Sequence, residues 1–299
     1  MNTNKIKKAL SPKVYFYFSL FLIIVTVTFI AFGKIAEKIT FNHLEKQINH
    51  YRSNFSGKPS LIIYKPGLFK FEFAHNPNEK IAAASLIKLP ILAVSLKAVD
   101  EGRIGFDQKV TITLEDITGG SGVFKRIDMP FSLTFKELLS FMIIISDNTA
   151  TNKVIDLLGK DYINKSFLSF GLEDTILERK MMDFVSRKKG FENYTSSRDV
   201  AKILKKIYYK QLINRQFSQF ARNLLSRQQY NDRIARFLPK DVEVAHKTGL
   251  EKEILHDAGI VYGKKNDFIV CVLIKNVTSY KKAKEFIAKV SRMSYNFLN

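Results

Sequence analysis

The stretch Ala82-Ala-Ala-Ser-Leu-Ile-Lys-Leu-Pro-Ile-Leu-Ala93 predicts an apolar helix that carries a serine and a lysine near its start. Ser85 and Lys88 are three residues apart, so they share one face of that helix. Apolar neighbours lower the pKa of a lysine, and a neutral lysine can act as a base toward a serine hydroxyl. At a helix start, free N–H groups favour developing negative charge. The stretch therefore predicts a serine nucleophile activated by a lysine.

The pattern Ser-x-x-Lys alone is weak evidence, because this chain contains it three times. Ser186-Arg-Lys-Lys189 lies in a charged loop, and Ser279-Tyr-Lys-Lys282 opens an amphipathic helix. A solvated lysine in either place keeps its proton and cannot serve as a base. Only Ser85-Leu-Ile-Lys88 has apolar surroundings.

Two further triplets follow in the chain, and each occurs once. Ser146-Asp-Asn148 comes directly after the apolar run Ile143-Ile-Ile145, and Lys247-Thr-Gly249 lies on a predicted strand. Taken singly, the first is typical of a turn at a helix end and the second of a strand end. Together with Ser85-Leu-Ile-Lys88, in this order, they indicate one catalytic site.

These three motifs make the chain resemble the class A β-lactamases, within the wider group of penicillin-recognising serine hydrolases. The resemblance covers about residues 56–298, and the distances between the motifs are similar to those of the family. It implies that Ser85 is acylated, that Lys88 is its base and that Ser146 relays a proton to the leaving nitrogen. The implied substrate-binding residues are Asn148, Lys247, Thr248, Gly249 and Leu250, and the backbone N–H groups of Ser85 and Leu250 would form the oxyanion hole.

One segment departs from the family pattern. The family positions its deacylating water with a loop glutamate that is followed three and four positions later by Leu-Asn. Here the matching segment reads Leu177-Glu-Arg-Lys-Met-Met-Asp183, which places Met181 at the glutamate position. Glu178 and Asp183 are nearby, but neither matches that position. Since a positioned general base is worth about 10²–10⁴-fold, acylation by β-lactams is better supported than fast turnover.

Three functions are compatible with these residues. The first is a serine hydrolase that is acylated at Ser85 by β-lactams and hydrolyses their amide, with slow deacylation. The second is a membrane-anchored D-Ala-D-Ala carboxypeptidase or penicillin-binding protein that acts on peptidoglycan peptides. The third is a non-enzymatic module that binds β-lactams or peptidoglycan and whose long-lived acyl-enzyme serves as a sensor or scaffold. The expected ligand is thus a small-molecule β-lactam or a peptidoglycan peptide, and protein partners cannot be predicted.

The net charge and the spacing of the histidines limit the kinds of ligand and partner that we expect. The formal net charge is +20, which suits anionic surroundings or simply a solvated lysine-rich surface, and we expect no nucleic-acid partner. The five histidines show no paired metal-binding spacing, so we expect no metal site and no cofactor. The single cysteine, Cys271, lies in an apolar segment and is predicted to be a buried strand thiol.

The amino terminus carries a targeting signal. Residues 14–32 contain no charge and are long enough to cross a hydrocarbon core of ~30 Å, and Lys5, Lys7, Lys8 and Lys13 precede them. We expect an uncleaved signal-anchor, with residues 1–13 as a cytoplasmic tail and the rest outside the cytoplasm. A cleaved signal, and hence secretion, is the alternative.

The remaining pattern predicts an α+β fold. A helix is expected over residues 33–55, followed by one hydrolase domain over residues 56–299. Strands are predicted at 61–64, 70–74, 242–247, 254–262 and 268–274, and the segments between them are mostly helical. We therefore expect one antiparallel sheet built from N- and C-terminal strands and flanked by helices, with an inserted helical subdomain and one preceding transmembrane helix.

Overall fold

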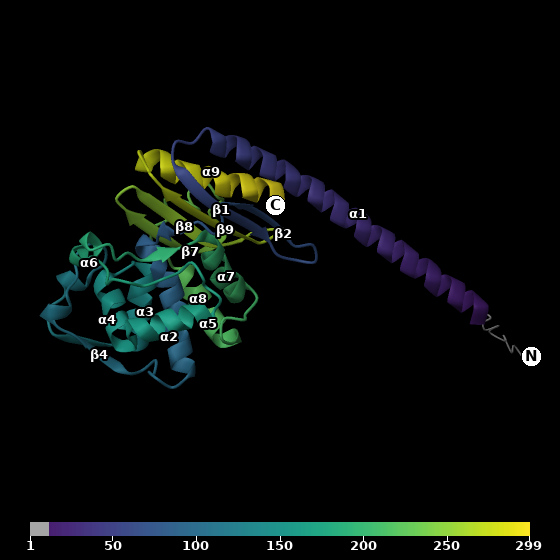
Figure 1. The fold of residues 1–299 in the computed structure, drawn as a ribbon. Helices are drawn as coiled ribbons and strands as arrows, with labels where there is room; N and C mark the ends of the chain where they lie inside the picture. The colour runs from purple at the N-terminus through teal and green to yellow at the C-terminus, as the bar shows by residue number, and fades with distance from the viewer. Residues whose placement is uncertain (1–11) are drawn as a thin grey trace, which may run out of the picture.

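The computed structural model describes residues 12–299. The predicted cytoplasmic tail, residues 1–13, therefore lies outside the described residues except for its last two. In the described part, strands from both ends of the chain form a central sheet, and helices cover both of its faces (Figure 1). This arrangement confirms the predicted α+β fold.

The central sheet joins segments that are far apart in the sequence. Within residues 12–299 its strand order is β2-β1-β9-β8-β7, and all neighbouring strands are antiparallel. The strands predicted at 61–64 and 70–74 are present as β1 and β2 and pair with each other as a hairpin. Ile62 of β1 lies opposite Cys271 of β9. The strands are β1 (Lys58–Lys65), β2 (Phe71–His75), β7 (Glu243–Glu251), β8 (Ile254–Tyr262) and β9 (Phe268–Lys275).

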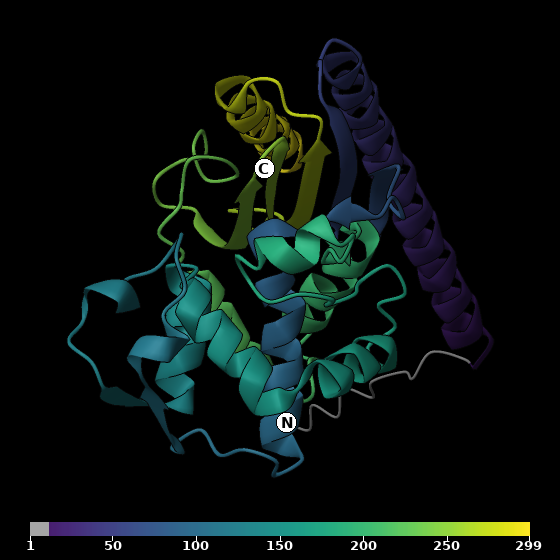
Figure 2. The same cartoon turned by 60° about the vertical axis from the view of Figure 1, so that its left-hand side comes forward.

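Alternate side chains of each strand point to opposite faces of the sheet. Helices cover both faces, so the side chains on both are buried. In β9, Cys271 belongs to the core on one face, while Val270 and Val272 belong to the core on the other. Figures 1 and 2 show α9 (Tyr280–Leu298) and the C-terminal part of α1 (Pro12–Ser53) on one face, and α2 (Lys88–Asp100) and α7 (Ser197–Tyr208) on the other. The burial of Cys271 confirms its prediction as a strand thiol.

A mainly helical region lies between the N-terminal and C-terminal strands, as predicted. A capping box formed by Thr134 and Glu137, which is readable in the sequence Thr134-Phe-Lys-Glu137, starts α3. The region contains helices α3 (Phe135–Ile144), α4 (Asn148–Leu158), α5 (Lys160–Ser169), α6 (Phe184–Lys188) and α8 (Arg215–Leu225), the short strands β3 (Ile81–Ala82), β4 (Lys109–Ile112), β5 (Phe131–Thr134) and β6 (Tyr194–Thr195), and the 3₁₀ turns η1 (Ala84–Ile87), η2 (Leu114–Asp116) and η3 (Phe124–Arg126).

Helix α1 has two different halves. Its apolar N-terminal half projects away from the rest of the protein, and its side chains are exposed (Figure 1). Its C-terminal part packs on the sheet through Phe41, Leu44 and Ile48, which are 0–4% exposed. The helix is long and apolar enough to cross a membrane.

Candidate active site

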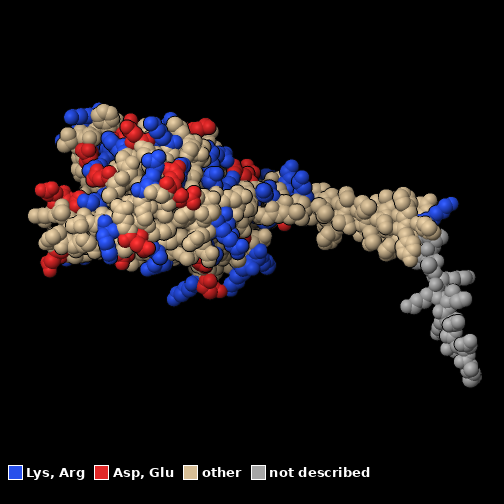
Figure 3. Space-filling view, turned by 90° about the horizontal axis from the view of Figure 1, so that it is seen from below, with Lys and Arg blue, Asp and Glu red and all other residues tan. Residues whose placement is uncertain are grey.

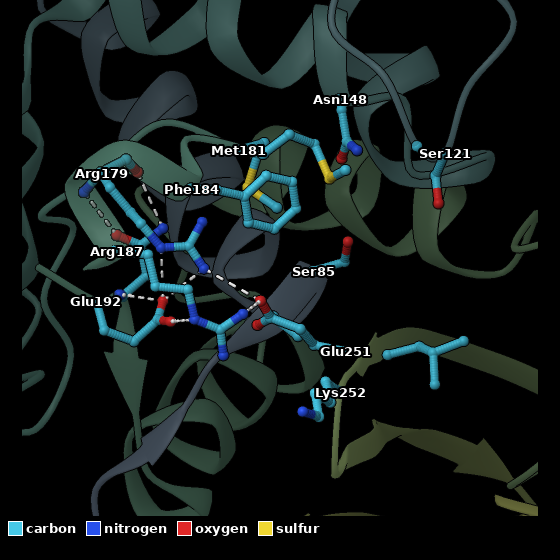
Figure 4. A pocket seen from close by; sticks show the side chains of 15 residues that line it. Ser85, Ser121, Asn148, Arg179, Met181, Phe184, Arg187, Glu192, Glu251 and Lys252 are labelled. Atoms are coloured by element: carbon cyan, nitrogen blue, oxygen red, sulfur yellow. Dashed lines mark hydrogen bonds and ion pairs between the residues drawn. The ribbon is translucent and has the colours of Figure 1, made fainter. Parts of the chain in front are cut away.

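A cavity of about 430 Å³ opens where the start of α2, the α3–α4 turn, the end of β7 and the loop 174–193 meet. Ser85 and Asn148 line it, together with Ser121, Met181 and Leu250. In Figure 4 the hydroxyl of Ser85 points into the open space between Asn148 and Ser121 on one side and Glu251 on the other. Residues of the first and second motifs thus line one cavity, and Leu250, directly after the third motif, lines it as well.

Ser85 lies in η1, which leads directly into α2. The preceding residue, Ala84, has a φ of 45°, in the left-handed region that costs a non-glycine residue free energy. The carbonyl of Ala83 faces Gly249 of β7, where a Cβ atom would lie 3.3 Å from it. Glycine at this position therefore lets β7 approach the backbone next to Ser85.

Lys88 is fully buried, and its ammonium group is held by the second motif. Its Nζ donates to the carbonyl oxygen of Ser146 at 2.6 Å, to the Ser146 hydroxyl at 3.0 Å and to Oδ1 of Asn148 at 2.8 Å. Burial lowers the pKa of Lys88 well below its ordinary value, and the charge of Lys247 lowers it further. Lys88 therefore has the character that a general base requires.

The second motif forms the turn between α3 and α4, and its middle residue organises the turn. Asp147 caps α4 by accepting from the N–H of Ala150 at 2.9 Å. The same carboxylate accepts from the N–H groups of Val123 and Phe124 at 2.7 and 3.2 Å. These bonds hold the loop 119–124 against the turn, and Nδ2 of Asn148 donates to the Gly119 carbonyl at 2.9 Å.

The third motif brings a second lysine to the Ser146 hydroxyl. Nζ of Lys247 lies 3.1 Å from Ser146 Oγ, so this hydroxyl is between two ammonium groups. Burial lowers the pKa of Lys247 to about 7, and the nearby charge of Arg233 adds to this effect. The Lys247 charge also contributes to the lowered pKa of Lys88, so the protonation of one lysine affects that of the other.

A proton can therefore be transferred along the hydrogen-bonded side chains of Lys88, Ser146 and Lys247. A neutral Lys88 can accept a proton from the Ser85 hydroxyl, and Ser146 can pass a proton from the lysine side to a group in the cavity. Lys247, with Thr248 only 5% exposed beside it, supplies positive charge for an anionic group. Leu250 follows on the same strand, and its side chain is 53% exposed at the rim of the cavity.

The loop 174–193 places a methionine at the cavity. Asn152 of α4 clamps the backbone of Met181, with Oδ1 accepting from its N–H at 2.7 Å and Nδ2 donating to its carbonyl at 3.1 Å. Figure 4 shows the Met181 side chain near Phe184. The residue aligned with the family glutamate therefore lines the cavity and carries no carboxylate.

The carboxylates near this cavity are engaged elsewhere. Glu178 accepts from the N–H of Glu192 at 2.9 Å, and Asp183 caps α6 through the N–H of Ser186 at 2.9 Å. Among the described residues that line the cavity, the acidic ones are Glu192 and Glu251, and both are ion-paired with arginines. These four side chains, Arg179, Arg187, Glu192 and Glu251, form an Arg–Glu cluster between the loop and the end of β7 (Figure 4).

Several residues of the site have no counterpart in the sequence-based expectations. The glycine-rich segment 119–122 is typical of a plain turn, yet Gly120 and Ser121 line the cavity. Asn152 is four residues after Asn148, so its position on the same helix face could have indicated it. The Arg–Glu cluster and Arg233 could not be predicted, because their partners lie in other segments of the chain.

Comparison with known proteins agrees with this geometry. The family model described as "Beta-lactamase enzyme family" matches residues 43–298. The extended-spectrum β-lactamase PER-1 of Pseudomonas aeruginosa is 26% identical over 244 residues, which cover 74% of this chain and 77% of that protein.

Solved structures show the same relationship. A β-lactamase from Sphaerobacter thermophilus is 28% identical with a TM-score of 0.76, covering 81% of this chain and 91% of that one. PBP-A is 29% identical with a TM-score of 0.78, and the match covers 85% of this chain and 95% of PBP-A. A mutant of PBP-A, 28% identical to this chain, was solved as an acyl-enzyme complex with penicillin G. The chain is a serine hydrolase that belongs to the class A β-lactamase enzyme family.

Proposed function

We propose that β-lactams acylate this protein at Ser85. Neutral Lys88 takes the proton of the Ser85 hydroxyl as Oγ attacks the lactam carbonyl, and the backbone N–H groups of Ser85 and Leu250 stabilise the oxyanion. Ser146 then delivers a proton to the leaving nitrogen, while Lys247 and Thr248 bind the substrate carboxylate and Asn148 binds the side-chain amide. The supporting observation is the Ser146 hydroxyl held 3.0 Å from Lys88 Nζ and 3.1 Å from Lys247 Nζ.

Hydrolysis of the acyl-enzyme is proposed to be slow. A water molecule needs a general base to attack the ester, and Met181 supplies none. Glu192 and Glu251 are neutralised by Arg179 and Arg187, and Asp183 caps α6. Lys88 is the remaining base, since its buried position keeps its pKa low. The loss of a positioned base slows a step by about 10²–10⁴-fold.

A second candidate function is cleavage of peptidoglycan peptides by a D-Ala-D-Ala carboxypeptidase or penicillin-binding protein. Met181 supports it, because a poor deacylation site for β-lactams need not be poor for a peptide ester. The similarity to PBP-A, whose mutant forms an acyl-enzyme with penicillin G, also supports it. Release of D-Ala from a wall pentapeptide by wild-type protein, and not by Ser85→Ala, identifies this activity.

The same proposal includes a membrane location. Residues 14–32 would span the membrane as an uncleaved anchor, with residues 1–13 on the cytoplasmic side. Residues 33–55 would then connect the anchor to a hydrolase domain over residues 56–299 outside the cytoplasm. The exposed apolar half of α1 supports this assignment.

Rapid mixing with a chromogenic cephalosporin tests the kinetic part of the proposal. We expect a burst of product equal to the enzyme concentration, followed by a slow steady rate. A steady rate above ~10 s⁻¹ without a burst, near the median for enzymes, would mean that a carboxylate supplies the base after all. An adduct that does not decay at all would favour a binding module instead.

A further inference from the structure

The turn of the first hairpin reaches the point where the exposed apolar half of α1 ends. We define this hairpin turn as residues 65–70, Lys65-Pro-Gly-Leu-Phe-Lys70, between β1 and β2. A Cβ atom at Gly33 would lie 3.5 Å from Cε2 of Phe69, so the turn contacts α1 immediately after the uncharged residues 14–32. In Figure 1 the hairpin extends along α1 toward its N-terminal half.

Two further contacts fix the hairpin to the helix. Nζ of Lys65 pairs with Oε2 of Glu37 at 2.9 Å, one helical turn beyond Gly33. The rings of Phe41 and Phe71 are stacked, with their centroids 5.5 Å apart. Since α1 is one unbroken helix from Pro12 to Ser53, these contacts set the level of the turn relative to the apolar half.

The surface of the hairpin turn combines an apolar tip with basic flanks. Leu68 is 82% exposed, among the highest values for a large apolar side chain in residues 12–299. Lys70 on the turn is exposed, as are Lys34 and Lys38, which follow the uncharged residues 14–32 on α1. Figure 3 shows lysine and arginine side chains where α1 leaves the body of the protein and uncharged surface beyond them along the helix.

We propose that the hairpin turn is a second membrane contact, with Leu68 inserted into the interfacial region of the bilayer that α1 spans. This inference rests on the proposed membrane anchor. An exposed apolar side chain beside lysines suits the boundary between acyl chains and anionic headgroups. A second copy of this chain fits less well, because its own lysines would face those around Leu68. With two contacts, the body is held in one orientation relative to the bilayer.

The absence of tryptophan from the sequence allows a direct test. Leu68→Trp places a single fluorophore at the tip of the turn. The matched control is Leu114→Trp. Leu114 is 77% exposed and lies in η2, which follows β4, and Figure 1 shows β4 on the opposite side of the protein from α1. Each full-length variant is reconstituted into vesicles of phosphatidylcholine and phosphatidylglycerol, with and without lipids brominated on the acyl chain near the headgroup.

We expect the emission of Leu68→Trp to shift to shorter wavelength and to be quenched by the brominated lipids, and that of Leu114→Trp to do neither. If the protein floats with the vesicles but Leu68→Trp is quenched no more than the control, the hairpin contact is wrong and the anchor stands. If the protein does not float with the vesicles, the anchor is wrong and the contact with it. A blue shift that needs no lipid and grows with protein concentration would assign the turn to contact between copies.

Discussion

The Ser146 hydroxyl is the residue-scale feature on which the proposed chemistry depends most. This hydroxyl lies between Lys88 and Lys247. The backbone of Ser146 has a φ of 60°, in the left-handed region. A non-glycine residue is held there at a cost of roughly 1–2 kcal/mol, which the bonds to the two lysines help to offset. The strain and the proton relay can be separated by two substitutions.

Ser146→Ala and Ser146→Gly should slow acylation equally and differ in stability. Both remove the hydroxyl relay, so acylation by a chromogenic cephalosporin should fall by about 10²–10⁴-fold in each. Glycine adopts a positive φ freely. The free energy of unfolding of Ser146→Gly should therefore be about 1 kcal/mol higher than that of Ser146→Ala. Stopped-flow acylation and urea unfolding measure the two effects. An alanine variant that acylates at the wild-type rate would remove Ser146 from the relay.

The two buried lysines predict a bell-shaped pH profile for kcat/KM of acylation. The rate should rise as Lys88 loses its proton, at a pH well below the ordinary lysine value, and fall above about pH 7 as Lys247 loses its charge. In Lys247→Arg the falling limb should disappear up to pH 9, because arginine keeps its charge. A flat wild-type profile between pH 6 and 9 would show that the charge of Lys247 is not needed for acylation.

The sequence predicts those site residues that lie in short motifs, and it does not predict residues that act from a distant segment of the chain. The predicted catalytic and substrate-binding residues lie in three short motifs. The structure brings these motifs together: Ser85 and Asn148 line one cavity, and the Nζ atoms of the two buried lysines lie 3.0 and 3.1 Å from Ser146 Oγ. Arg233 is 3% exposed and lowers the pKa of Lys247, but nothing in its neighbouring sequence indicates this. Its effect arises only because the segment between α8 and β7 folds back to bring Arg233 close to Lys247.

At the scale of elements, the Arg–Glu cluster joins the loop 174–193 to the end of β7. Arg179 is 5% exposed and pairs with Glu192 at 2.7 Å and with Glu251 at 3.3 Å. Burial raises the pKa of Glu251, and the charge of Glu192 raises it further, so the arginines are needed to keep this carboxylate charged. The cluster therefore positions Met181 and its loop over the cavity.

Arg179→Ala should destabilise the protein much more than Arg187→Ala. Removing Arg179 takes the more buried arginine out of the cluster and leaves Glu192 and Glu251 to Arg187 alone, which should cost up to about 3–5 kcal/mol. The Arg187 side chain is 34% exposed, so its loss should cost about 1 kcal/mol or less. Urea unfolding of both variants gives the comparison. Equal losses would mean that the loop is held by its backbone contacts with Asn152 and Asn193 instead.

The sequence predicted the helices and strands that have a clear hydrophobic periodicity or a capping motif. The strands of the central sheet and α3 carry such signals, and the structure confirms them. Helix α8 was not predicted, although its buried residues Phe217, Ala221 and Leu224 recur at helical spacing. In α5 the signal is weaker, since its buried apolar residues are only Ile163 and Phe167.

At the scale of the whole molecule, α1 serves both as the exposed apolar segment and as part of the core. Phe41, Leu44 and Ile48 pack with α9 and the sheet, so the globular body includes the C-terminal part of this helix. A chain that begins at residue 34 should therefore be soluble without detergent and as stable as the full-length protein. A chain that begins at residue 56 should lose several kcal/mol, because each large buried side chain contributes about 2–5 kcal/mol. Identical urea midpoints would show that α1 adds nothing to the fold.

Intact mass followed in time after mixing with penicillin tests the acylation of Ser85 and its slow reversal most directly. We predict that the wild-type protein gains the mass of one penicillin, keeps it while free penicillin is present and loses it slowly after the excess is removed. Ser85→Ala should gain none. An undiminished adduct on Ser85→Ala would place the nucleophile elsewhere, and rapid consumption of penicillin with no adduct at any time would contradict slow deacylation.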